Sequence, residues 1–180
     1  MPGPTAPFRI LAVILVLALP AMASDRPGYS FASIDGGTLS LADWEGRPVL
    51  VVNTASRCAF TKQYDGLQAL YDRYRDRGLI VLAVPSGDFR QELSSDRKVK
   101  EFCELNYDLD LPMTTITPVR GEGAHVFYRW LAEAHGFVPS WNFNKVLLGP
   151  DGAVVATYGS ATRPLSKTVT GEVEKLLPQG

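Results

Sequence analysis

Cys58 is one of only two cysteines in the 180-residue sequence, and it lies between an apolar run and a segment with helical spacing. The apolar run covers residues 49–52, and apolar side chains recur at three- and four-residue steps after Gln63. A turn from a buried strand into a helix offers free backbone N–H groups and the positive end of the helix dipole. Both stabilise a thiolate, the nucleophilic form of cysteine. We therefore predict that Cys58 is reactive.

The residues around Cys58 support this interpretation. Arg57 and Lys62 are expected to favour the thiolate by their charge, and the neighbouring serine and threonines argue against inert packing of the thiol in an apolar core. Thr61 occupies the position of the second cysteine in a Cys-X-X-Cys motif. Any thiol that resolves an oxidised Cys58 must therefore come from elsewhere in the fold.

Cys103 is the second cysteine and falls on the apolar side of a predicted helix, beside Val99 and Phe102. Two roles follow from the residues alone. The thiol either packs in the core as a small apolar group or forms a structural cross-link with Cys58, as is common in exported proteins.

Apolar periodicity and turn residues predict the elements that position the two cysteines. Strands that are apolar on both faces are typical of a sheet covered by helices on both sides. We predict an α/β fold, a thioredoxin-like three-layer α/β/α sandwich with an N-terminal β-hairpin. The predicted hairpins are 29–34 with 38–41 and 145–148 with 153–158, the other strands 49–53, 79–84 and 113–117, and the helices 63–78, 94–106, 124–134 and 165–177.

Composition indicates one globular domain and excludes some partners. The chain is 46% hydrophobic and 21% charged, with a formal net charge of -1 and no cluster of basic residues. A nucleic-acid partner has no electrostatic basis in such a sequence.

The first residues are typical of a secretory signal. Arg9 precedes the uncharged segment 10–19, and Ala21-Met22-Ala23 offers small residues for cleavage. An uncleaved anchor is the alternative, but the apolar segment is too short to span a bilayer of about 30 Å. We expect a signal peptide over residues 1–23, an exported, periplasmic domain over residues 24–180, and no membrane contact after cleavage.

Four segments resemble the glutathione peroxidase family. "VVNTASRCAFTKQYDGLQALYDRY" is similar to its active-site motif, close to V-N-V-A-S-x-C-G-x-T, and "PSWNFNKVLLGPDG" to its W-N-F-x-K-F-L-V signature. "VLAVPSGDF" lies where the family has F-P-C-N-Q-F, and "FCELNYDLDLPM" resembles the helix that bears the resolving cysteine in two-cysteine members. The resemblance runs from residue 29 to residue 177.

This resemblance implies a role for each matching residue. Cys58 is then the peroxidatic nucleophile, and Trp141 and Asn142 donate hydrogen bonds to its sulfur and to the oxygen of the breaking O–O bond. Cys103 is then the resolving thiol, which condenses with a sulfenic acid on Cys58. Because a disulfide needs Cα atoms within about 7 Å, the helix that carries Cys103 is expected to loosen between the two states.

The resemblance also implies partners. The substrate is a hydroperoxide, and the reductant is either glutathione, as the family name suggests, or a thioredoxin-like protein, as two cysteines at these positions suggest. The short link of residues 136–140 lacks the long insertion of tetrameric members, which implies a monomer.

One residue departs from the family pattern. Asp88 stands where the family has glutamine, and a carboxylate cannot donate a hydrogen bond. Either Asp88 faces away from the site, is protonated, or pairs with a cation such as Arg57 or Arg90. Since the following stretch is one residue shorter than in the family, Gln91 could take the vacant place. Both Asp88 and Gln91 stay candidates.

Two other functions stay open. A thioredoxin-fold thiol-disulfide oxidoreductase shares a cysteine between strand and helix, and an exported binding module could use Cys58 and Cys103 only as a cross-link. We expect no cofactor. His125 and His135 are ten positions apart and far in sequence from either cysteine, which does not match a zinc-ligand spacing.

Overall fold

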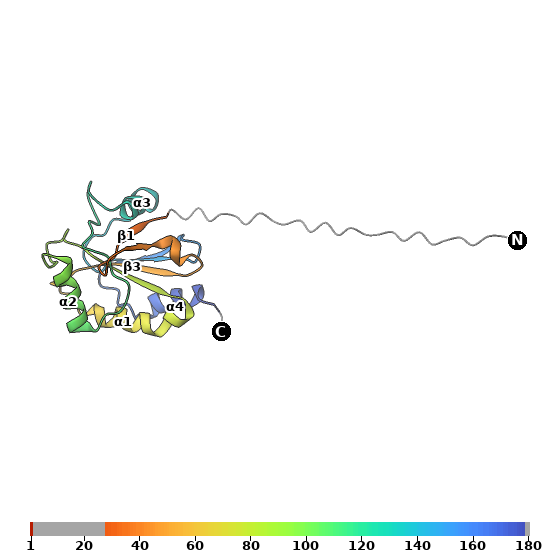
Figure 1. Ribbon diagram of the computed structural model, residues 1–180, viewed down its shortest axis with the longest axis horizontal. Helices are drawn as coiled ribbons and strands as arrows, with labels where there is room; N and C mark the ends of the chain where they lie inside the picture. Colours follow the sequence, from red (N-terminus) through yellow and green to blue (C-terminus); the bar gives the residue numbers. More distant parts are fainter. Residues whose placement is uncertain (2–27, 179–180) are drawn as a thin grey trace.

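The computed structural model describes residue 1 and residues 28–178 (Figure 1). Apart from Met1, the predicted signal peptide lies outside the described residues. Among the helices of the described part, none is long and apolar enough to cross a bilayer.

The centre of the fold is a four-stranded mixed sheet in the order β4-β3-β5-β6. Strand β3 (Val49–Thr54) pairs in parallel with β4 (Ile80–Pro85) and antiparallel with β5 (Lys145–Leu148), which pairs antiparallel with β6 (Val154–Tyr158). The parallel pair requires a crossover, which helix α1 (Gln63–Tyr74) supplies. Strand β3 is therefore central, and its C-terminal end leads directly towards Cys58.

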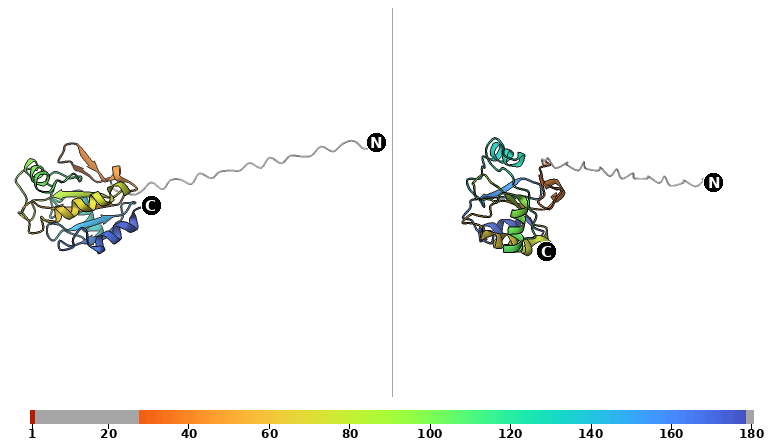
Figure 2. Two further views of the ribbon diagram at one scale, coloured as in Figure 1. Left: turned by 90° about the horizontal axis from the view of Figure 1, so that it is seen from below. Right: turned by 60° about the vertical axis from the view of Figure 1, so that its left-hand side comes forward.

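Helices cover both faces of this sheet, as the doubly apolar strands predict. Alternate residues of β3 enter two separate cores, with Leu50 and Val52 on one face and Val49 and Val51 on the other. Helices α1, α2 (Asp96–Tyr107) and α4 (Lys167–Leu176) supply residues to the first core, and α3 (Val126–His135) to the second. Figures 1 and 2 show α1 and α4 together on one side of the sheet and α3 on the other. The predicted three-layer sandwich is confirmed.

The N-terminal hairpin is also confirmed, with shorter strands than predicted. Strands β1 (Ser30–Ala32) and β2 (Thr38–Ser40) pair antiparallel around a turn in which Gly36 and Gly37 have φ values of 91° and 76°. Only glycine adopts such conformations at little cost. A short 3-10 helix, η1 (Leu41–Trp44), then leads to β3.

The strand predicted at residues 113–117 is wrong. Only isolated bridges occur there, one from Met113 to Ala83 and one from Thr114 to Ser33. The Thr114 and Thr117 hydroxyls both donate to the carbonyl of Thr115, and such local bonds compete with a regular ladder. Prolines on both sides of the segment further limit extended pairing.

The four predicted helices are present, with ends that differ by a few residues from the predicted ones. Helix α1 continues as a 3-10 turn, η2 (Arg75–Arg77), and closes at Gly78, whose φ of 110° suits glycine alone. Helix α2 begins after Ser95, whose hydroxyl accepts the N–H of Lys98 as an N-cap.

Candidate active site

Cys58 lies in a turn that a single threonine closes. The hydroxyl of Thr61 accepts the N–H of Cys58 over 3.0 Å, and its oxygen lies 2.6 Å from the Cys58 carbonyl and 3.0 Å from that of Ala55, to which it can donate. The N–H of Phe60 donates to the Cys58 sulfur over 3.5 Å. A donor aimed at sulfur favours the thiolate. This donor comes from the turn before α1, and not from α1 itself.

The sulfur is shielded and the nearby cations are in solvent. Cys58 is 8% exposed, whereas the side chains of Arg57 and Lys62 are exposed, and neither forms an ion pair with a described residue. The backbone N–H of Arg57 donates to the carbonyl of Gln91 over 2.9 Å. This bond ties the Cys58 turn to the loop that follows β4.

Asn53, near the end of β3, holds the Trp-Asn-Phe segment (residues 141–143) next to the strand that leads to Cys58. Its side-chain amide donates to the carbonyl of Trp141 over 2.9 Å, and its own carbonyl accepts the N–H of Phe143 over 2.6 Å. Phe143 has a positive φ of 62°, which costs strain in a residue other than glycine. The strand that leads to Cys58 thus also positions Trp141 and Asn142.

Trp141 and Asn142 differ in their surroundings. Trp141 is 41% exposed, and its ring lies 5.2 Å from that of Phe89. Asn142 is fully buried, and its side-chain amide donates to Oε1 of Gln91 over 3.0 Å. Through the Arg57 backbone, Gln91 therefore joins Asn142 to the Cys58 turn.

The Asp88 carboxylate binds the backbone of residues 119 and 120. Its Oδ2 accepts the N–H groups of Val119, over 2.6 Å, and Arg120, over 3.1 Å. Of the cations raised by the sequence, neither Arg57 nor Arg90 forms an ion pair with Asp88 among the described residues, and two backbone N–H groups bind the carboxylate instead. Gln91, the second candidate, is the one that contacts a predicted site residue.

Glu92 is a partly buried carboxylate between the end of β3 and α2. Its Oε1 accepts the N–H groups of Ser56 over 3.1 Å and of Leu93 over 2.7 Å. Burial raises the pKa of Glu92, and these hydrogen bonds oppose the rise. The sequence did not indicate that Glu92 is partly buried, because a glutamate in a polar loop is usually exposed.

Cys103 is buried in the same core as Cys58, and neither cysteine is in a disulfide. It is 1% exposed. Burial raises the pKa of the Cys103 thiol to about 12, and the charges of Glu92 and Glu104 act in the same direction. The hydroxyl of Tyr64 opposes the shift. Cys103 is therefore a neutral thiol at physiological pH while α2 stays folded against α1.

Lys145 is a site neighbour that sequence reasoning missed. Its side chain is fully buried, and Nζ donates to the carbonyl of Phe143 over 2.7 Å. Burial lowers the pKa of Lys145 to about 8. The signal available in the sequence is a single lysine that opens an otherwise apolar strand, which does not distinguish a buried ammonium from an exposed strand end.

The histidines have structural contacts. His125 caps α3, where its Nδ1 accepts the N–H of Phe127 over 3.3 Å, and its ring stacks on Phe31 with centroids 4.1 Å apart. The ring of His135 lies at the edge of Trp130. Within the described residues, no three His, Cys, Asp or Glu side chains gather in a way that could hold a metal ion.

A βαβ unit, a hairpin and a final helix around a mixed sheet, with a reactive-type cysteine after the central strand, define a thioredoxin-fold thiol protein. Comparison with known proteins narrows this class. The family model described as glutathione peroxidase matches residues 28–132. The chain belongs to the glutathione peroxidase family and is a thiol-dependent peroxidase.

Relatives match nearly the whole described chain. A hydroperoxy fatty acid reductase of Synechocystis sp. is 40% identical over 161 residues, which covers 83% of this chain and 94% of the relative. A glutathione peroxidase-like peroxiredoxin of Schizosaccharomyces pombe is 36% identical over 79% of this chain and 92% of its own. The crystal structure of Trgpx in its apo form is similar with a TM-score of 0.65 and 27% identity, over 83% of this chain and 93% of that one.

Proposed function

We propose that this peroxidase reduces hydrogen peroxide and organic hydroperoxides through Cys58, with Cys103 as the resolving thiol. The observation that carries the proposal is the environment of the Cys58 sulfur, which is shielded from solvent and accepts the Phe60 N–H at the end of the central strand. Hydrogen-bond donors in a shielded site stabilise developing negative charge better than the same donors in water.

In the first step, the Cys58 thiolate attacks one oxygen of the hydroperoxide. The S–O bond forms as the O–O bond breaks, and the leaving oxygen takes a proton and departs as water or an alcohol. Sulfur is oxidised to a sulfenic acid. The Asn142 amide N–H that does not bind Gln91 and the indole N–H of Trp141 are proposed to donate hydrogen bonds to the departing oxygen and so to stabilise its charge. Gln91 holds the Asn142 amide in place, whereas Asp88 has no part in this step.

In the second step, the Cys103 sulfur attacks the sulfenic sulfur, an S–S bond forms and hydroxide leaves as water. Attack requires the thiolate, and the buried Cys103 has a pKa of about 12. Exposure of Cys103 to solvent removes the desolvation that causes this shift. Resolution therefore needs α2 to open, and opening both activates the sulfur and lets it approach Cys58.

An external dithiol closes the cycle by reducing the disulfide. The relative named as a peroxiredoxin supports a thioredoxin-like protein as the reductant, with glutathione as the alternative from the family name. The relative named as a hydroperoxy fatty acid reductase supports organic hydroperoxides among the substrates. The residues at the start of the sequence support export to the periplasm after cleavage behind Ala23, and the short link of residues 136–140 supports a monomer.

Stopped-flow oxidation of the reduced protein tests the proposal. We expect one equivalent of hydrogen peroxide to oxidise the parent, Cys58→Ser to be unreactive, and Cys103→Ser to react as fast as the parent but to stop at a sulfenic acid that a dimedone reagent traps. A protein that reduces insulin disulfides and ignores peroxide would instead be a thiol-disulfide oxidoreductase. If Cys58→Ser only lowers stability, the cysteines form a structural cross-link.

The proposals on export and oligomeric state have their own measurements. Intact mass of the protein recovered from a periplasmic fraction should correspond to a chain that begins at Ser24, and an uncleaved chain in the cytoplasm would contradict export. Light scattering of the purified protein should give the mass of one chain.

A further inference from the structure

Lys145 is the only charged side chain among the described residues that is fully buried, and the reaction proposed above does not use it. Its partner in the strand register is Val52, and Leu147, two residues further along β5, packs in the first core with Val52 and Cys58. Because side chains alternate along a strand, the Lys145 side chain lies on the same face of the sheet as Leu147. The reactive cysteine therefore shares its side of the sheet with a buried ammonium group.

Burial of this ammonium group works against the stability of the fold. Lys145 forms no ion pair with any residue in the described part of the chain, and burial lowers its pKa to about 8. A buried charge without a partner of opposite sign costs stability. A lysine at a position where an apolar side chain of similar length would avoid this cost points to a role other than packing.

The Lys145 ammonium group binds the turn that carries two site residues. Its Nζ donates to the carbonyl of Phe143 over 2.7 Å, and a hydrogen bond from a charged donor is stronger than one from a neutral donor. Phe143 has a positive φ of 62°, a strained conformation that persists only where its surroundings hold it. Its N–H donates to the carbonyl of Asn53 over 2.6 Å. Both backbone polar groups of the strained residue are thus held.

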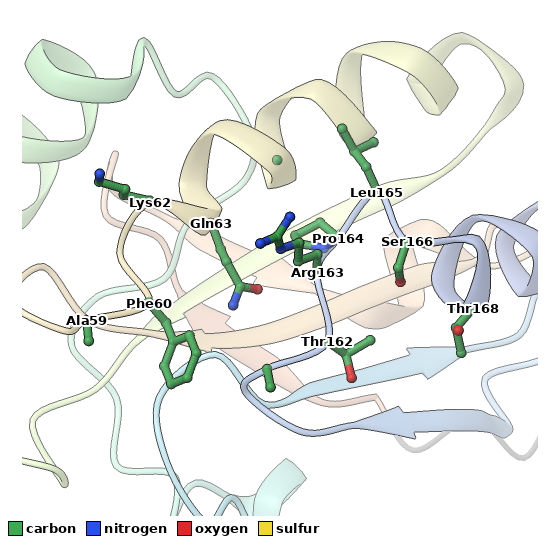
Figure 3. A pocket seen from close by; sticks show the side chains of 12 residues that line it. Ala59, Phe60, Lys62, Gln63, Thr162, Arg163, Pro164, Leu165, Ser166 and Thr168 are labelled. Atoms are coloured by element: carbon green, nitrogen blue, oxygen red, sulfur yellow. The ribbon is translucent and has the colours of Figure 1, made fainter.

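The residue that follows this turn is held by other contacts. The side-chain amide of Asn144 donates to the hydroxyl of Ser160 over 2.8 Å, and the carbonyl of Ser160 accepts the amide of Gln63 over 2.6 Å. Figure 3 shows the Gln63 side chain projecting from the start of α1 beside the loop that joins β6 to α4. Lys145 supplies the only side-chain donor to the Phe143 carbonyl among the residues that the structure describes.

The direction of the Asn142 side chain depends on this backbone. Asn142 is fully buried, its amide donates to Gln91, and its Oδ1 has no hydrogen-bond partner in the described chain. Since Asn142 directly precedes Phe143, a change in the strained backbone of Phe143 turns the Asn142 side chain. Misplacement of a catalytic group by about 1 Å can lower a rate about a hundredfold.

We infer that Lys145 is a positioning residue for the peroxidase reaction: its buried ammonium group holds the Phe143 carbonyl and so keeps Asn142 and Trp141 directed at the oxygen that departs from the hydroperoxide. Lys145 acts through the turn and not on the reacting atoms. The inference rests on the proposed function, because it concerns how the hydrogen-bond donors of that reaction are kept in place.

Lys145→Met tests this role in chains that also carry Cys103→Ser, so that Cys58 is the only thiol. We expect the substitution to lower the rate constant for oxidation of Cys58 by hydrogen peroxide about tenfold, because the donors to the departing oxygen are misplaced. Oxidation by peracetic acid should fall by less than about threefold, because its leaving group, acetate, is a stable anion that needs little help from hydrogen-bond donors.

Alkylation of Cys58 by iodoacetamide distinguishes misplaced donors from a disturbed cysteine. No oxygen departs in this reaction, so its rate in Lys145→Met should stay within about twofold of the parent. An equal loss with all three reagents would mean that Lys145 supports only the Cys58 turn or the fold, and would overturn the inference. Lys175→Met makes the same substitution at an exposed lysine that pairs with Glu172, and should leave all three rates unchanged.

A cycle of single and double variants tests whether Lys145 acts through Asn142. Asn142→Ala removes the donor that Lys145 is inferred to position. In that variant, Lys145→Met should lower the rate with hydrogen peroxide by less than about threefold, because two residues that act through one interaction have losses that do not add. Full additivity of the two losses would contradict the inference.

A structural measurement separates this inference from the peroxidase chemistry. In ¹⁵N NMR spectra, Lys145→Met should shift the indole N–H signal of Trp141 and the side-chain amide signals of Asn142, whereas Lys175→Met should not. Lys145→Gln keeps a neutral donor and should show the same pattern with smaller changes, so it serves if the methionine variant does not fold.

The outcomes for the two proposals differ. If hydrogen peroxide oxidises the parent and Lys145→Met equally fast and these signals do not move, the positioning role is rejected and the peroxidase function stands. If the signals move but no peroxide oxidises Cys58 in the parent, the peroxidase function is rejected, and Lys145 is shown to hold the turn without serving that reaction.

Discussion

The side-chain amide of Asn142 donates a hydrogen bond to Oε1 of Gln91 over 3.0 Å, with Asn142 fully buried. Gln91 in turn accepts the backbone N–H of Arg57, one residue before the reactive cysteine. This pair links the loop after β4, the Trp-Asn-Phe segment and the Cys58 turn. Our proposal is that Gln91 takes the place of the glutamine that the family resemblance expects at position 88, because it contacts both the Asn142 amide and the Arg57 backbone.

Substitution of Gln91 tests this replacement. Gln91→Ala removes the acceptor that orients the Asn142 amide, and we expect the rate constant for Cys58 oxidation to fall about tenfold or more, since loss of a preorganised donor costs at least that much in other enzymes. Stopped-flow oxidation by hydrogen peroxide is the measurement. The matched control is Asp88→Asn, which keeps an oxygen acceptor for Val119 and Arg120 and should react like the parent. A slow Asp88→Asn with a fast Gln91→Ala would reverse the assignment.

Thr61 gives a second prediction, because its hydroxyl closes the turn that presents Cys58. Thr61→Val keeps the shape of the side chain but leaves the buried N–H of Cys58 without its acceptor. We expect the free energy of unfolding to fall by about 1–3 kcal/mol, the usual cost of an unsatisfied buried group, and the oxidation rate to fall with it. Denaturant unfolding and stopped-flow oxidation measure the two effects. Thr61→Ser keeps the hydroxyl and should restore both.

Much of this architecture could be predicted from the sequence, because the signals are local and strong. The apolar runs at residues 49–52 and 79–84 predicted two strands buried on both faces, and the helical spacing after Gln63 predicted the helix between them; the parallel pairing is seen only in the structure. The strand predicted at residues 113–117 is wrong because threonine side chains bond to the nearby backbone, which apolar periodicity does not register.

The missed features depend on contacts between residues that are distant in sequence. In the sequence, nothing distinguishes Asn53 from other strand residues. The structure shows that its side-chain amide and its carbonyl form hydrogen bonds with the segment that begins at Trp141. The choice between Asp88 and Gln91 likewise required the direction of each side chain, which spacing alone left open. Lys145 is the clearest case, since nothing in its sequence neighbours indicates that an ammonium group lies fully buried in a strand.

Burial of Lys145 predicts a specific dependence of stability on pH. Its pKa is lowered from 10.5 to about 8, so the unfolded chain binds the proton more tightly than the folded one. The contribution of Lys145 to the free energy of unfolding therefore rises as pH increases from about 8 to 10.5, by roughly 3 kcal/mol at 1.36 kcal/mol per pKa unit. Below pH 8 the contribution is constant.

Lys145→Met tests this dependence, because methionine has a similar length and does not titrate. We expect the difference in unfolding free energy between parent and variant to grow in favour of the parent across the window from pH 8 to 10.5. Both chains should carry Cys103→Ser, because the raised pKa of Cys103 lowers the unfolding free energy of both proteins as pH rises above the free pKa of a thiol, and this background is best removed. A difference that is independent of pH would mean that Lys145 is charged in the folded protein at pH 10.

The N-cap of α2 gives the final prediction, which concerns the opening of the helix that carries Cys103. The Ser95 hydroxyl accepts the N–H of Lys98, and Ser95→Ala should weaken the helix by about 1 kcal/mol. If opening of α2 limits disulfide formation, a weaker helix is open more of the time, and the rate of resolution should rise about fivefold while the first oxidation step is unchanged.

Ser166→Ala is the matched control, because Ser166 also stands at an N-cap position, that of α4, but has no side-chain capping bond. It should leave the resolution rate unaltered. Disulfide formation can be followed after one equivalent of hydrogen peroxide by quenching free thiols and resolving the products by mass, and hydrogen exchange of α2 reports its opening directly. Faster exchange in Ser95→Ala without faster resolution would show that helix opening is not the limiting step, so that Cys103 would have to reach Cys58 by a smaller movement.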